Sequence, residues 1–175
     1  MAQLNFHQEY YITPTIITGI SDGTLSFVPL NIRDSVSLNT VNMWISFSSA
    51  AQTHTFNIGL YSLTGSTLSI ANSISGTISA SNNQRRYISF TATSATQNIT
   101  PGTWWFGLLI RTSGNANISL DAANIINAQN AFPGAFTGGR MSVSTNAIPA
   151  SIATSDLDIT GSDATALRPI IIISA

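Results

Sequence analysis

The chain has 175 residues, a formal net charge of -1 and 7% charged residues, while 43% of its residues are hydrophobic. This length suits a single domain that buries its own core, and the hydrophobic content excludes a disordered chain. The six basic residues are all arginines, and the balance of charge leaves no basic field of the kind that nucleic-acid binding needs. The sequence has no cysteine, so it predicts neither disulfides nor thiolate chemistry.

The first seven residues lack the basic and apolar segments of a secretory signal, and the longest apolar run, Ile170 to Ile173, is too short to span a membrane. We therefore expect a chain that is made in a cytoplasm, is not secreted by the usual route and does not insert into membranes. Its solubility rests on abundant neutral Ser, Thr, Asn and Gln. That composition is typical of a protein that works at high local concentration, as on a particle, where copies should not repel one another.

Residues 1–23 are predicted to form an N-terminal arm or an edge strand. Tyr10 and Tyr11 lie in an amphipathic segment, Pro14 interrupts any regular strand, and Ser21-Asp22-Gly23 is expected to form a turn. One interpretation is a strand along the side of the domain. The other is an arm that reaches a neighbouring subunit, with Tyr10 and Tyr11 at the interface.

Residues 24–175 are predicted to form one all-β domain, an antiparallel β-sandwich similar to a jelly roll. Apolar residues alternate with polar ones in short runs about 8 to 12 residues apart, with Gly, Asn and Pro between the runs. A 3.6-residue period occurs only weakly, at 120–130, where Asp121 could cap one helical turn. The strands are expected from Leu25 to Val28, with an end at Pro29, and at Val36 to Phe47, Phe56 to Tyr61, Leu68 and Ile70, Ile74 and Ile78, Tyr87 to Thr93, Trp104 to Ile110, and Leu167 to Ile173.

The run that follows Pro101-Gly102 is apolar on both faces. Trp104, Phe106, Leu108 and Ile110 share one face by period-two spacing, while Trp105 and Leu109 lie on the other. A strand that is apolar on both sides needs a cover on both sides. The second cover is either another layer of the domain or a neighbouring subunit, which would place Trp105 and Leu109 in a subunit interface.

Several residues are candidates for binding a glycan or a partner. Residues 128–148 form an irregular stretch in which Phe132 and Phe136 stand among glycines and a proline. They belong either to a functional loop or to a flap that plugs the end of a sheet. Trp105 and Tyr61 could stack on sugar rings, although aromatic residues in strands are usually core.

The sequence holds little that predicts catalysis. Neither His7 nor His54 has a serine or carboxylate neighbour of the kind a catalytic triad needs, and Glu9 is the one glutamate. We therefore expect no enzymatic activity and no cofactor. Asp156, Asp158 and Asp163 resemble the start of a calcium loop, but the pattern is incomplete and a solvated turn accounts for it.

The order of these segments resembles a known family. Ile58-Gly59-Leu60-Tyr61 followed by a Gly loop, then Pro101-Gly102-Thr103-Trp104 and a closing strand after Pro169, is similar to the β-sandwich domains of bacteriophage tail fibres and virion appendages. The resemblance implies a virion protein without catalysis, commonly a homotrimer, that contacts other virion proteins and can bind a host glycan.

The expected function is therefore that of a virion structural protein acting in host attachment. Two alternatives are a capsid decoration protein, since no shaft or coiled coil precedes the domain, and a carbohydrate-binding module or glycan-processing enzyme. Trimerisation follows from the two-faced strand and from the resemblance.

Overall fold

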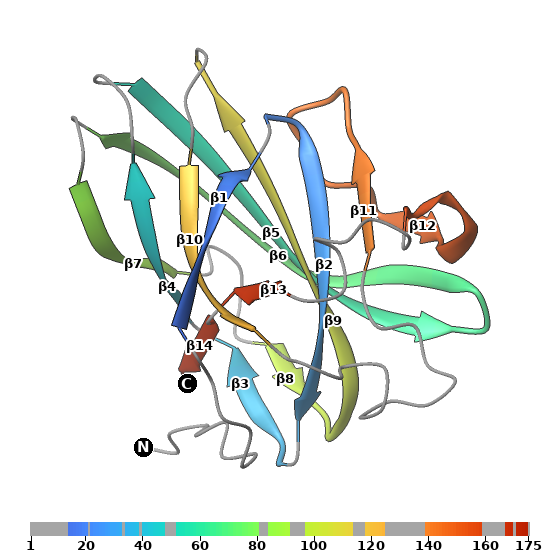
Figure 1. Ribbon diagram of the computed structural model, residues 1–175. Coiled ribbons are helices and arrows are strands. Elements are labelled where there is room, and N and C mark those ends of the chain that lie inside the picture. The colour runs from blue at the N-terminus through green and yellow to red at the C-terminus, as the bar shows by residue number, and fades with distance from the viewer. Residues whose placement is uncertain are drawn as a thin grey trace.

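A computed structural model describes residues 14–20, 22–32, 34–38, 40–47, 52–80, 84–91, 97–113, 118–124, 139–158, 167–169 and 171–174. Their strands form two six-stranded antiparallel sheets and one two-stranded ribbon (Figure 1). The predicted all-β sandwich is confirmed.

The first sheet is built around β4 (Thr40–Phe47) and is called the β4 sheet. β7 (Gln84–Thr91) pairs with one side of β4, and β10 (Ile118–Asn124) and β14 (Ile171–Ser174) share the other side. β1 (Pro14–Ile20) and β13 (Leu167–Pro169) both pair with β10. Within the described residues β1 is thus an edge strand, as one interpretation of the N-terminal segment predicted.

The second sheet is built around β9 (Gly102–Thr112) and is called the β9 sheet. Its strand order is β11 (Gly139–Ser142), β2 (Thr24–Ile32), β9, β5 (Gln52–Thr64), β6 (Thr67–Ala80) and β12 (Ser151–Ala153). β5 and β6 form a long hairpin, and Gly65 at its tip has a φ of 59°, which glycine adopts readily. β3 (Val36–Leu38) and β8 (Gln97–Ile99) form the separate ribbon.

One hydrophobic core fills the space between the two sheets. The alternating residues predicted to share a face do so, because both sheets turn their apolar side chains toward each other. Phe56 and Phe90 meet there with ring centroids 5.1 Å apart. The buried members of this inner core are Ile32, Val41, Met43, Ile45, Phe56, Ile58, Leu60, Ile74, Phe90, Ile99, Phe106, Leu108 and Ile110.

Five element predictions were wrong. The expected strands Val36 to Phe47 and Leu167 to Ile173 are each two strands with different partners, β3 with β4 and β13 with β14. Asp121 does not cap a helical turn, because Ile118–Asn124 is strand β10, paired with both β1 and β4. The strand at Leu25 does not end at Pro29 but continues to Ile32. The expected strands at Leu68 and Ile70 and at Ile74 and Ile78 are one strand, β6 (Thr67–Ala80). A Cβ at Gly76 would lie 2.9 Å from the Phe90 ring, so this glycine makes room for a ring and forms no turn.

A β-bulge divides β6 between the two faces of its sheet. Tyr61 pairs with Ile70 and Leu60 pairs with Asn72, so Ala71 has no partner on β5. One extra residue reverses the side on which the following residues project. Leu68 and Ile70 accordingly pack on the outer face of the β9 sheet, whereas Ile74 and Ile78 pack in the inner core.

Candidate functional site

The outer face of the β9 sheet carries a second hydrophobic core, which is the feature that distinguishes this sandwich. Trp105 and Leu109 lie at its centre and are 2% and 0% exposed. Phe27 and Tyr61 from the neighbouring strands pack beside them. The strand that the sequence showed to be apolar on both faces is therefore buried on both faces.

The second cover comes from the same chain. Residues 139–158, called the back cover, begin at one edge of the β9 sheet as β11, cross its outer face as an irregular segment and reach the opposite edge as β12, which the short 3-10 helix η1 (Thr154–Asp156) follows. Val143, Ile152 and Leu157 are its buried contributions, and Met141 and Ile148 pack partly buried against the same cluster. Figure 1 shows β11 and β12 on the side of the molecule away from β7. A neighbouring subunit is not needed to bury Trp105 and Leu109.

Two glycines make room for an aromatic ring under this cover. Gly59 and Gly107 are cross-strand partners on β5 and β9. A Cβ at Gly107 would lie 2.9 Å from Phe27 Cε1 and 3.0 Å from Tyr61 Cε2, too close without a shift. The Tyr61 ring occupies this space and meets Phe27 edge to face, with centroids 5.1 Å apart. Its hydroxyl then donates a hydrogen bond to the carbonyl oxygen of Pro149 at 2.8 Å.

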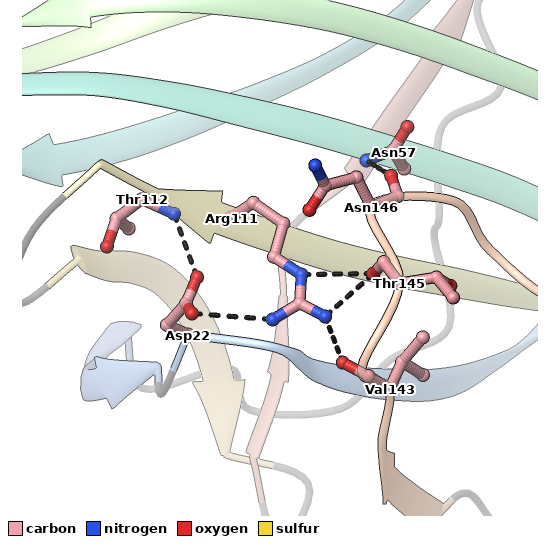
Figure 2. Close-up of polar contacts among 7 residues, drawn as sticks. All are labelled: Asp22, Asn57, Arg111, Thr112, Val143, Thr145 and Asn146. Atoms are coloured by element: carbon pink, nitrogen blue, oxygen red, sulfur yellow. Dashed lines mark hydrogen bonds and ion pairs between the residues drawn. The ribbon is translucent and has the colours of Figure 1, made fainter.

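The irregular part of the back cover is held by side chains that donate to its carbonyl oxygens. Arg111 on β9 donates from Nε and Nη2 to the Thr145 oxygen at 3.1 and 2.7 Å, and from Nη2 to the Val143 oxygen. Asn57 on β5 donates to the Asn146 oxygen at 2.9 Å. Figure 2 shows these donors converging on one stretch of backbone. A segment without a strand partner thus has its acceptors satisfied, as a packed backbone requires.

Asp22 completes the arrangement around Arg111. Its carboxylate lies 3.4 Å from Arg111 Nη1 and accepts a hydrogen bond from the Thr112 backbone N–H at 2.8 Å (Figure 2). Gly23 follows with a φ of 74°, and any side chain there would clash with the guanidinium. The Asp22-Gly23 turn, predicted from the sequence, therefore also positions the arginine. No local pattern indicates that Arg111 binds the backbone some thirty residues further along the chain.

The described residues offer little for acid–base chemistry. Desolvation lowers the pKa of buried His54, which favours its neutral form at physiological pH. Desolvation raises the pKa of Tyr61 well above its usual value, which keeps the hydroxyl protonated as a donor. Across the described part of the chain, no three His, Asp or Glu side chains gather as they would around a metal ion. The arrangement is a clamp that holds the back cover on the sheet.

The residues predicted to bind a ligand or a subunit fall into two groups. Tyr61, Trp105 and Leu109 are core residues beneath the back cover, so none offers an open face to a sugar ring or to another subunit. The physical reason is the packing of the back cover, which local sequence patterns do not reveal. Phe132, Phe136, Tyr10 and Tyr11 lie outside the described residues, and their roles stay predictions.

The aspartates of the possible calcium loop are only partly described. Asp156 lies in η1, where it accepts a hydrogen bond from Ser155, and Asp158 is exposed and lies 3.8 Å from the Arg140 guanidinium. Asp158 and Arg140 also exchange backbone hydrogen bonds, which extends the β9 sheet beyond β11. Asp163 lies outside the described residues, so the proposed loop as a whole stays untested.

Comparison with known proteins assigns the chain to no family. No protein-family model matches the sequence, and no curated protein matches it either. In the described ranges, no helix has the length and apolar character that crossing a membrane requires. The class that the structure establishes is that of an all-β, double-cored antiparallel sandwich.

Proposed function

We propose that the chain is a non-catalytic structural protein of a bacteriophage virion, displayed on the particle and used in host attachment. The observation that carries the proposal is an exposed, uncharged surface on the outer face of the β9 sheet, in the part that the back cover does not reach. Beyond the back cover, the outer face of the β5–β6 hairpin presents side-chain hydroxyls on neighbouring strands. This hydroxyl face consists of Thr53, Thr55, Ser73, Ser75, Thr77 and Ser79.

The chemistry of this face suits adhesion. Hydroxyl groups both donate and accept hydrogen bonds, as the hydroxyls of surface polysaccharides do. The face carries no charge, so many copies side by side on a particle meet no like-charge repulsion. The sheet beneath it is packed on both sides over much of its area, which holds the hydroxyls in a fixed array and limits the entropy lost on binding.

Competition for adsorption tests the proposal. Purified protein added to host cells before the phage should reduce phage adsorption, and gold-labelled antibodies against the chain should mark the tail of intact particles. The variant Thr53→Asp/Thr55→Asp, which puts like charges on the hydroxyl face, should compete less well. Ser144→Asp/Ser155→Asp, which adds the same charge to exposed positions of the back cover, is the matched control.

The possible results separate the candidate functions. Labelling confined to the capsid shell, with no competition for adsorption, would replace host attachment with capsid decoration. Turnover of a host glycan by the purified protein would contradict the non-catalytic assignment. Absence of the chain from purified particles would overturn the virion assignment itself.

A further inference from the structure

Among the described residues, the outer edge of β6 has no partner strand along most of its length. β12 pairs with β6 only from Thr67 to Ser69, and Ile70 adds one bond, from its N–H to the Ala150 oxygen at 2.9 Å. From Ala71 to Ala80, no described strand lies on the side of β6 away from β5. Alternate residues of a strand turn their N–H and C=O groups to opposite sides. In this part of β6, about five residues therefore point these groups away from β5, where no described strand pairs with them.

Three other edge strands of the sandwich, β12, β11 and β7, are protected in recognisable ways. β12 has three residues and β11 has four, and β11 is continued by the backbone bridge between Arg140 and Asp158. β7, at the edge of the β4 sheet, contains two arginines in its sequence. Short strands, charges and capping contacts are the usual means of preventing edge-to-edge pairing. The open part of β6 has no charge and no proline, and its one bulge lies at its beginning.

From Ser73 to Ser79, the sequence of this open edge is symmetric about Gly76 in the kind of side chain. Reading outward in both directions gives Ser75 and Thr77, then Ile74 and Ile78, then Ser73 and Ser79. When two antiparallel copies of a strand are related by a two-fold axis at one residue, positions equally distant from that residue face each other. An axis at Gly76 would therefore pair isoleucine with isoleucine and hydroxyl with hydroxyl.

We propose that the β6 edge binds a second copy of this chain. The two β6 strands pair antiparallel about a two-fold axis at Gly76 and join the two β9 sheets into one continuous sheet. Ile74 of each copy faces Ile78 of the other on the inner side, which extends the apolar surface of both inner cores. Ser75 faces Thr77 on the outer side, where the hydroxyls hydrogen-bond across the strands. This inference goes beyond the proposed function and does not depend on it.

A second copy fits this edge better than a charged partner does. The open part of β6 has no charged residue that would attract a charged partner. A second copy of the same strand adds no charge that would repel the first. The contact is limited to one strand from each copy, which places it among small interfaces, so we expect a dissociation constant in the micromolar range. The association is thus concentration-dependent, and high local concentration on a particle would favour it.

Sedimentation measures the association directly. Between ~1 and ~100 μM, we expect the wild-type mass to rise from 18.5 kDa toward twice that value. S75K/T77K places lysines opposite each other across the two-fold axis and should weaken dimerisation by at least ~10-fold. S75D/T77D should do the same with negative charge. An equimolar mixture of the two variants should regain a dimer, because each lysine then faces an aspartate.

The mixture and a control variant separate interface loss from misfolding. S66K/S69K adds two charges to exposed positions near the part of β6 that β12 already covers, so it should dimerise like the wild type. A wild-type protein that stays at 18.5 kDa throughout, or that forms a trimer, would overturn the proposal. So would a wild-type dimer that S75K/T77K leaves unchanged, or a mixture of the charged variants that stays monomeric.

Discussion

Arg111 offers the sharpest test of how the back cover is held. Arg111→Met keeps the aliphatic part of the side chain but removes every donor that reaches Val143 and Thr145. Hydrogen bonds from a charged donor contribute roughly 1.5–3 kcal/mol each. The segment is partly exposed, so water can replace part of these hydrogen bonds in the variant. The ion pair with Asp22, whose carboxylate is about half exposed, adds only ~0–1 kcal/mol to the free energy of unfolding. We therefore expect the free energy of unfolding to fall by about 3 kcal/mol.

Urea-induced unfolding followed by tryptophan fluorescence measures this loss, and thermal unfolding should show a melting temperature lower by roughly 6–12 °C for a domain of this size. Arg140→Met is the matched control, because its ion pair with Asp158 is exposed at 3.8 Å and should contribute less than ~1 kcal/mol. An Arg111→Met variant within ~0.5 kcal/mol of the wild type would refute the assigned role, since the carbonyl oxygens would then not depend on the guanidinium.

Three further outcomes follow from the two cores. Tyr61→Phe should lower the free energy of unfolding by about 1–2 kcal/mol, because the Pro149 oxygen loses its donor; ultraviolet titration of the wild type should show one tyrosine that ionises only on unfolding. Since the folded pKa of Tyr61 is raised, the stability linked to it should decline above about pH 10, and Tyr61→Phe should remove that decline. Gly107→Ala should cost about 1–3 kcal/mol in urea unfolding, because the added methyl group meets Phe27 and Tyr61 at 2.9 and 3.0 Å; a neutral result would contradict the close packing. The lowered pKa of His54 should make the wild type lose stability as the pH falls below about 6.5, whereas a His54→Gln variant should lack that dependence.

Much of the fold could be predicted because each strand carries its own pattern. The faces of β5, β9 and β4 follow from strict alternation, and the turns at Gly23 and Gly65 follow from glycine. Pro29 was misleading because a proline usually ends an inner strand. β11 pairs only with Thr24 to Phe27, so β2 has a described partner on one side alone at Pro29, and the missing N–H can face the open side.

The candidate site was less predictable because its parts are distant in sequence. The two-faced pattern around Trp105 correctly indicated a second layer, but it did not show which chain provides that layer. Val143, Ile152 and Leu157 supply the cover without any common period, and the clamp from Arg111 depends on tertiary contact alone. Trimerisation stays a prediction, and the two-faced strand that suggested it is now accounted for within one chain.

The bulge at Ala71 has a consequence for how the molecule comes apart. The first residues of β6 pack in the second core, on the outer face of the sheet, and its remaining residues pack in the inner core. Unfolding that begins in either core therefore removes β6 from both. The two cores are thus expected to melt together, as one cooperative unit built from two separate interiors.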